Sequence, residues 1–391
     1  MTAEARKFSL KHLIPLLFCL FSLQLAAQDE HASHAASQAT DSTAAAHTSD
    51  AHAADSHSAA FDPGKMIVDH ITDTHDWHLW GHTHVPLPVI LYTPSGFECF
   101  SSGVFKNHET HASQAHTGKH HTYVLEDEKI LVLGVNGEVD PTLSASIIDV
   151  SITKNVLTIF IVSAIMLLVF LSVARAYTRK PGQAPKGLQS FMEPLIIFVR
   201  DDIAKPSIGP KYEKFMPYLL TVFFFIWIAN LLGLVPVIPG GANMTGNIAV
   251  TFSLAVLTFI ITTVNGNGHY WRHILAMPGV PVWALVLLSP IEVLGMFLRP
   301  FVLMIRLFAN ISAGHIIALA FFSLIFIFGD GGKSVGGGLG VGVASWLFTT
   351  FMMCLELLIA FLQAYVFTLL SAIYFGSAVE DHHHEAHASH S

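Results

Sequence analysis

Charged and polar side chains interrupt a strongly apolar stretch that runs from Pro281 to Gly329. Arg306 and Asn310 lie four residues apart, on one face of a helix, and His315 follows further along. An arginine at bilayer depth costs about 2.5–3.5 kcal/mol unless it faces protein or a water-filled path. The pattern therefore indicates an ion pathway. The structural alternative is an arginine whose stem only reaches up to the membrane surface.

The length of this stretch excludes a single upright membrane span. As a helix it would be roughly 70 Å long, against roughly 30 Å of hydrocarbon. We expect it either to break, with kinks at Pro290 and Pro300, or to lie strongly tilted against other protein. Arg299, next to Pro300, is interpreted as a structural residue that reaches towards the surface.

A second apolar segment near the C-terminus carries Glu356 and Gln363, which are seven residues apart and share a helix face. If the two segments pack antiparallel, Gln363 falls near the level of Arg306, and Glu356 near that of His315. Whether both pairs touch depends on helix curvature, which the spacing leaves open. His315 has a structural alternative, a hydrogen bond to a backbone carbonyl of a neighbouring helix.

Composition predicts the fold class, an all-α polytopic membrane protein with a small β-containing exported N-terminal region. The 391 residues are 52% hydrophobic and only 12% charged, with a mean hydropathy of +0.54. We expect five crossings, the last two long and tilted. Besides the stretch described first, they are Leu157–Ala174, Phe215–Pro236, Asn247–Val264 and Val341–Tyr374. Residues 187–209 mix apolar and charged positions at helical spacing and are expected along the membrane surface.

The N-terminal third divides into three segments. Residues 1–27, with a basic start and an apolar centre, read as a signal peptide, and an uncleaved anchor is the alternative. Residues 28–60 are rich in Ala, Ser and His without apolar periodicity and are expected to be a disordered linker. Residues 61–150 contain short β-prone runs bounded by Pro and Gly, which predict a small exported extension. Its function is not readable from these residues.

Charge distribution predicts the orientation. Residues 28–151 hold 4 Lys or Arg and 17 Asp or Glu, whereas basic residues follow the first span at once, beginning with Arg175. The positive-inside rule then places the N-terminus outside and the C-terminus in the cytoplasm of a multi-pass protein of the bacterial inner membrane. The membrane domain is expected over residues 151–380, followed by a His-rich cytoplasmic tail, residues 381–391.

Histidine is clustered outside the spans. Fifteen of the 24 histidines lie between His31 and His121, and five more lie in the tail. Clustered imidazoles favour Zn²⁺ or Ni²⁺, but scattered histidines in an acidic segment bind weakly or only buffer protons, and we expect no defined metal site. The alternative function is a His-rich transporter of zinc or another divalent cation. It predicts ligand pairs within the spans, which offer one His and two Glu around an Arg that repels cations. A binding module merely anchored by the helices is a third possibility.

Three motifs carry a family resemblance. IEVLGMFLRPFVLMIRLFANISAGHIIALA, with its core RLFANxxAGH, resembles the signature helix of subunit a of F-type ATP synthases. ELLIAFLQAYVFTLLSAIYF is similar to that family's last helix, and NLLGLVP near Asn230 matches as well. The resemblance covers roughly residues 157–377 and not the N-terminal third. It implies the stationary half of a proton channel, which forms two half-channels against the rotating ring of c subunits.

The resemblance also implies roles for residues. Arg306 matches the family's essential arginine, which faces the c-ring carboxylate, and arginine suits this task because its charge is permanent. Asn310 and Gln363 match polar positions beside that contact, and Glu292 resembles a residue of the cytoplasmic half-channel.

The pair of His315 and Glu356 is exchanged relative to family members that carry the carboxylate first and the histidine second. The exchange indicates contact between the two groups in the half-channel on the exported side.

The implied partners are the c-subunit ring, the b-subunit stalk, the rest of the F1Fo complex and the lipid bilayer. No nucleic acid and no cofactor is expected. ATP chemistry is expected on other subunits, because residues 332–334, Gly-Lys-Ser, complete no phosphate-binding loop. A proton is the expected ion.

Overall fold

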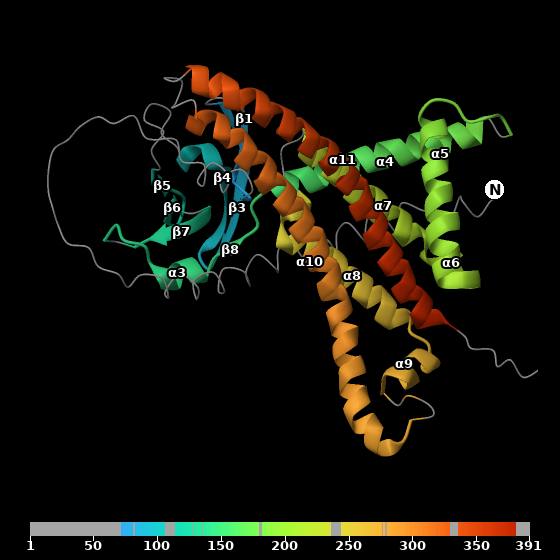
Figure 1. Ribbon diagram of the computed structural model, residues 1–391. Helices are drawn as coiled ribbons and strands as arrows, with labels where there is room; N and C mark the ends of the chain where they lie inside the picture. Colours follow the sequence, from blue (N-terminus) through green and yellow to red (C-terminus); the bar gives the residue numbers. More distant parts are fainter. Residues whose placement is uncertain are drawn as a thin grey trace, which may run out of the picture.

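The computed structural model has a β-rich part followed by a helical part (Figure 1). It describes residues 72–80, 83–105, 114–126, 128–134, 136–179, 182–235, 244–275, 277, 280–328 and 335–380. The expected signal peptide, the linker, the His-rich tail and the Gly-Lys-Ser run lie outside the described residues.

The β-rich part contains eight strands within the described residues. They are β1 (Asp76–Trp80), β2 (Thr83–Pro86), β3 (Pro88–Thr93), β4 (Gly96–Ser101), β5 (His116–Thr117), β6 (Thr122–Glu126), β7 (Lys129–Leu133) and β8 (Ile148–Asp149). A 3-10 turn (Ser102–Phe105) follows β4, and the short helix α3 (Pro141–Ala145) precedes β8. All pairings are antiparallel, in the orders β1-β2, β4-β3-β8 and β5-β6-β7. The predicted β-containing region is confirmed.

Alternation of side chains explains why this small region holds together. Successive residues of a strand point to opposite faces, so β3 buries Val89 and Leu91 and exposes Tyr92. On β6 and β7 the same alternation buries Tyr123 and Val132. These four side chains and two others form one apolar cluster that joins the two three-stranded sheets.

The helical part contains eight α-helices within the described residues. They are α4 (Lys154–Arg179), α5 (Leu188–Phe198), α6 (Lys205–Ile208), α7 (Tyr212–Leu234), α8 (Ile248–Asn265), α9 (Gly268–Leu275), α10 (Val282–Phe328) and α11 (Val335–Val379). A π-helical turn (Val199–Ala204) joins α5 to α6, and a 3-10 turn (Gly209–Lys211) joins α6 to α7. Among the described residues, five helical stretches are long and apolar enough to cross a membrane. This confirms the predicted polytopic fold.

The expected helix over residues 187–209 is confirmed as the arm formed by α5, the π-helical turn and α6. Gly209 has φ +74°, a backbone conformation that glycine adopts without strain, and the chain turns there into α7 (Figure 1). The position of this arm along the membrane surface stays a prediction.

α10 and α11 are confirmed as the two longest helices, with 47 and 45 residues. They run side by side in opposite directions (Figure 1). The alternative of a break was wrong, because α10 continues through both Pro290 and Pro300. A proline removes one backbone donor and crowds the preceding turn, but the helical backbone of α10 resumes beyond each proline.

The β-rich part is tied to the first residues of α4. The Asp73 carboxylate accepts hydrogen bonds from the Thr153 hydroxyl (2.9 Å) and the Asn155 amide (3.0 Å), and the Lys154 amide donates to the Thr74 carbonyl (2.9 Å). The first backbone N–H groups of a helix lack partners within the helix, so Asp73 caps α4 from 80 residues away. Burial raises the pKa of Asp73, although Asn155, Thr153 and Lys154 oppose that rise.

Candidate functional site

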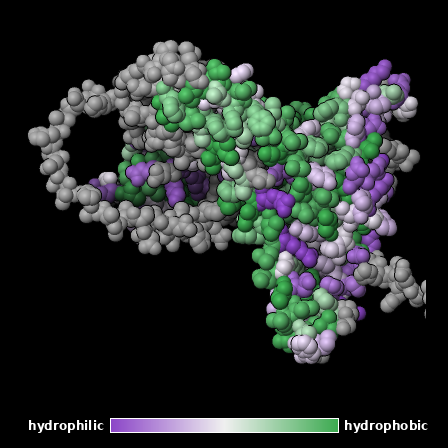
Figure 2. Space-filling model, viewed as in Figure 1, coloured by the Kyte–Doolittle hydropathy of each residue, from purple (hydrophilic) through white to green (hydrophobic). Residues whose placement is uncertain are grey.

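Arg306 lies on the exposed side of α10. Phe301, Val302 and Ile305, which precede it in the chain, are also exposed, by 50, 47 and 45%. Figure 2 shows apolar surface along α10 and α11. A permanent charge on an apolar membrane-facing surface is costly unless an oppositely charged group meets it. The side of α10 that carries Arg306 therefore requires a partner that brings a negative charge.

Two contacts establish how α10 and α11 are aligned. A Cβ placed on Gly314 of α10 would lie 2.7 Å from Oε1 of Glu356 on α11, so the glutamate packs against that glycine. Further along, the Arg299 guanidinium of α10 lies 5.8 Å from the centre of the Tyr374 ring of α11. For antiparallel helices, interpolation between these contacts puts Arg306 opposite residues 365–366, within one helical turn of Gln363. This is the alignment that the sequence predicts for antiparallel packing.

Glu356 is only 4% exposed, and Gln363 on the same face of α11 is also 4% exposed. Among the described residues, Oε1 of Glu356 has no hydrogen-bond partner. A buried carboxylate oxygen without a partner is costly, so this position needs a proton, water or a further side chain. His315 follows Gly314 directly, which brings its backbone to the helix turn that touches Glu356. The side chains of His315 and Asn310 lie outside the described part of the chain.

A polar network beside Glu356 was missed by the sequence reasoning. Asn230 of α7 is 4% exposed; its side chain donates to the Ala360 carbonyl of α11 (3.3 Å) and accepts from the Thr245 hydroxyl (2.6 Å). Ala360 lies one helical turn after Glu356. In the sequence, the NLLGLVP motif indicates only a family resemblance. Its first residue, Asn230, is a polar side chain in an apolar helix and could have predicted this buried contact.

A second polar group lies on the other side of Arg306 along α10. Arg299 and Tyr374 line a small cavity of about 10 Å³ together with Thr262 of α8 and Tyr270 of α9. That volume is close to the space one water molecule needs. Glu292 is half-buried and lies about four helical turns before Arg306. The interpretation of Arg299 as a purely structural residue stays a prediction, and its stacking on Tyr374 is consistent with it.

No group of three or more His, Cys, Asp or Glu side chains is arranged to hold a metal ion, as far as the structure describes the chain. His84, from the densest histidine run, is exposed.

Comparison with known proteins supplies the family. The family described as ATP synthase A chain matches residues 156–376. The chain belongs to this family. A domain of unknown function, DUF8433, matches residues 66–150, so the β-rich part has its own family.

Relatives named ATP synthase subunit a share nearly half of the aligned residues. The protein from Chloroherpeton thalassium is 43% identical over 63% of this chain and 73% of its own length. ATP synthase subunit a 2 from Chlorobaculum tepidum is 47% identical over 65% of this chain and 70% of its own. Subunit a from Anaeromyxobacter sp. is 42% identical over 61% of this chain and 57% of its own.

The chain is therefore a multi-pass membrane protein and the proton-translocating stator subunit a of an F-type ATP synthase. Membership implies the c-subunit ring and the b-subunit stalk as its partners in the complex. The zinc-transporter alternative and the anchored binding module are set aside by this family membership.

Proposed function

We propose that Arg306 is the residue of this subunit that meets the carboxylate of each passing c subunit. The observation that carries the proposal is its position, a permanent charge exposed among Phe301, Val302 and Ile305 on a helix that belongs to the membrane part. An acidic group on a neighbouring membrane helix supplies the missing counter-charge, whereas lipid cannot.

The chemistry follows from electrostatics. A guanidinium beside an arriving carboxylate stabilises its ionised form, so the proton is released there. The same positive charge opposes the passage of a free proton along α10, so the two half-channels stay separate. Arginine performs both tasks because it keeps its charge at all working pH values. Asn310 and Gln363, at the same level of the helix pair, orient water or the carboxylate.

Glu356 and His315 form the half-channel on one side of Arg306. Glu356 is buried against Gly314, and Asn230 provides polar groups one helical turn away. Imidazole and carboxylate exchange protons near neutral pH in either order along the chain, which explains why the exchanged arrangement is functional.

Glu292 contributes to the half-channel on the other side of Arg306. The cavity lined by Arg299, Tyr270 and Tyr374 lies on this same side of Arg306 and has room for a water molecule.

The orientation that fits the charges puts the β-rich part outside the cell membrane and the C-terminus in the cytoplasm. Arg175 and Arg179 end α4, and Lys205 and Lys211 precede α7, so basic residues gather at one membrane side. In this orientation the Glu356 side receives protons from the exported side, and the Glu292 side opens to the cytoplasm.

Replacing Arg306 with Ala tests the proposal. In membranes that contain the assembled complex, ATP synthesis and ATP-driven proton pumping fall to background, because protons are no longer released at the c ring. Arg272→Ala, in the last turn of α9, is the matched loss of an arginine and leaves both activities unchanged. Coupled synthesis that survives in Arg306→Ala membranes with normal amounts of complex would refute the role.

A further inference from the structure

A pocket opens where three membrane helices end. It has a volume of about 370 Å³ and is lined by residues before and within the first turn of α7, at and after the end of α8 and at the end of α11. The lining residues are Lys211, Glu213, Lys214, Phe215, Asn265, Asn267 and Val379. Because these helices begin or end here, the pocket lies at the level where phospholipid headgroups meet water.

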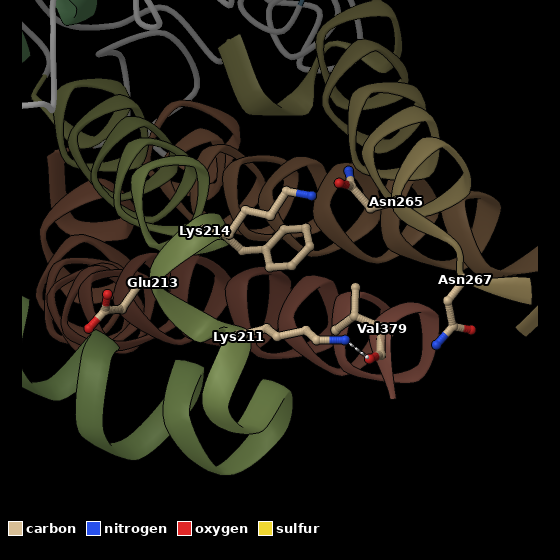
Figure 3. Close-up of a pocket in the computed structure, with 7 residues that line it drawn as sticks. Lys211, Glu213, Lys214, Asn265, Asn267 and Val379 are labelled. Carbon is tan, nitrogen blue, oxygen red and sulfur yellow. Dashed lines mark hydrogen bonds between the residues drawn. The ribbon is translucent and has the colours of Figure 1, made fainter. Parts of the chain in front are cut away.

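Two lysines give the pocket its charge. The Lys211 ammonium donates a hydrogen bond to the Val379 carbonyl (3.1 Å), which neutralises the negative end of α11 (Figure 3). The Lys214 ammonium lies 5.6 Å from the centre of the Phe215 ring. Within the part of the chain that the structure describes, Lys214 has no hydrogen-bonded or ion-paired carboxylate. Its charge is available to a ligand.

The walls of the pocket are held in place. Phe215 stacks on Phe375 of α11 at 4.8 Å between ring centres. The Asn265 side chain donates to the Ile261 carbonyl (2.7 Å), and the Asn267 side chain donates to the Glu380 carbonyl (2.8 Å). These bonds fix both asparagines. A pocket that needs little rearrangement loses little entropy when it binds a ligand.

The one carboxylate among the lining residues does not oppose an anion. The Glu213 side chain points away from Lys214 and Asn265, as Figure 3 shows. The other charged lining groups, Lys211 and Lys214, are both cationic, so the pocket favours a negatively charged group.

We propose that this pocket binds a phosphate group, either the phosphodiester of an anionic phospholipid headgroup or free phosphate. Lys214 supplies the charge and ammonium donors that a phosphate oxygen accepts, and Lys211 keeps the neighbouring helix end neutral. The buried ring of Phe215 lies beside Lys214 and forms an apolar wall of the pocket. The site does not depend on the role proposed for Arg306. It adjoins the Glu292 side of the proton path, because its Asn267 side chain accepts a hydrogen bond from the Tyr270 amide (2.8 Å).

The test uses the full-length chain purified in detergent with equal amounts of phosphatidylglycerol and phosphatidylcholine. Native mass spectrometry counts the lipid molecules that each variant retains. The wild type is expected to retain phosphatidylglycerol in preference, and Lys214→Gln to lower its occupancy about tenfold. Lys214→Arg, which keeps the charge, is expected to retain it. Lys186→Gln removes an exposed lysine elsewhere and leaves the occupancy unchanged.

A second arm titrates lipid-depleted protein with inorganic phosphate and follows the phosphorus resonance. Binding that depends on Lys214 in this arm only supports the site and identifies free phosphate as its ligand. Equal retention of both lipids by the wild type, together with no phosphate binding, overturns the proposal. The proposal is also overturned if Lys186→Gln lowers occupancy as much as Lys214→Gln.

Discussion

Two charged side chains of the membrane part differ in their surroundings. Arg306 is exposed on α10, whereas Glu356 on α11 is 4% exposed and packs against Gly314. An exposed arginine in an apolar surface can contact a moving partner subunit. A buried carboxylate instead exchanges its proton with neighbouring groups of the same chain. The difference in burial matches the two roles we propose, contact with the ring and conduction within the subunit.

Gly314→Ala tests whether the position of Glu356 controls conduction. The added methyl would lie 2.7 Å from Oε1 and 3.1 Å from Cγ of Glu356, so the carboxylate must move. We expect proton flux through the assembled complex to fall about 10- to 100-fold, because proton transfer is sensitive to displacements of about 1 Å.

The matched control for this substitution lies on the same helix. A methyl on Gly295 would meet nothing within 4 Å, so Gly295→Ala is expected to keep the flux of the wild type. Flux in vesicles is measured by quenching of a pH-sensitive dye. Equal flux in both variants would show that Glu356 tolerates displacement and does not carry the proton.

Residue spacing predicted some of this site and could not predict the rest. That Glu356 and Gln363 share a buried face follows from a separation of two helical turns. The contact of Glu356 with Gly314 depends on how two helices of more than forty residues curve around each other, which no local pattern encodes. The hydrogen bond between Asn230 and Ala360 joins residues 130 positions apart, so local spacing could not predict it either.

At the scale of elements, α11 approaches α6 closely at one glycine. A Cβ on Gly376 would lie 1.9 Å from the Ser207 carbonyl oxygen of α6, so only glycine allows these helices to meet. We expect Gly376→Ala to destabilise the subunit by about 1–3 kcal/mol, the usual cost of overpacking. Gly342→Ala, on the same helix with open space around it, is the control. Thermal unfolding in detergent measures both, and unchanged stability in Gly376→Ala would contradict the packing.

The β-rich part contains an ion cluster near the start of α4. His75 is 5% exposed; its Nδ1 lies 3.3 Å from Oε2 of Glu128, and its Nε2 lies 3.6 Å from Oδ2 of Asp149. Burial opposes the charge of His75, but the nearby carboxylates of Asp149 and Glu128 outweigh it and raise the pKa to about 9. Burial likewise opposes the charges of Glu128 and Asp149, but His75 outweighs it and lowers the pKa of both.

This cluster predicts how the stability of the β-rich part depends on pH. Because the folded pKa of His75 lies above its ordinary value of 6.5, its contribution is complete below pH 6.5 and is lost as the pH rises through about 9. The shift corresponds to about 3 kcal/mol. Hydrogen exchange of residues 122–133, corrected for intrinsic rates, should accelerate over that range.

His75→Gln removes the effect, and His84→Gln, at an exposed strand position, preserves it. Asp73, Asp76 and Lys154 also lie near the cluster. His75→Gln leaves these three groups in place, so its comparison with the wild type isolates the loss of stability between pH 6.5 and 9 that is due to His75. A flat profile in the wild type would mean that His75 is neutral in the folded protein.

The strands could be predicted from the sequence, whereas the course of α10 and the cap of α4 could not. The β-prone runs became strands β1 to β4, β6 and β7 because alternation and turn residues are local signals. The predicted breaks at Pro290 and Pro300 did not form, because α10 continues as one helix through both prolines, which a local proline signal does not predict. Asp73 as the cap of α4 could not be anticipated either, since the two ends of that contact are far apart in sequence.

In the described residues, the β-rich part and the membrane part each have a large hydrophobic core of their own. One lies in the β-rich part around Leu91 and Tyr123, and the other in the membrane part around Phe223 and Phe224. The two families that match the chain meet near the same place, at residues 150 and 156. Each part is therefore expected to fold around its own core, with the Asp73 cap as a link between them.

Deleting residues 66–150 tests this independence. Because the membrane core and every proposed proton-path residue lie outside the deletion, the shortened chain should assemble with its partners and keep the proton flux of the wild type. Its first helical turn, residues 154–158, loses the cap and should exchange amide hydrogens faster. In the full-length chain, Asp73→Asn weakens the hydrogen bonds from Thr153 and Asn155 and should accelerate exchange there alone, by about fivefold for a loss of about 1 kcal/mol. A deletion that assembles but loses flux would show instead that the β-rich part acts on the proton path through α4.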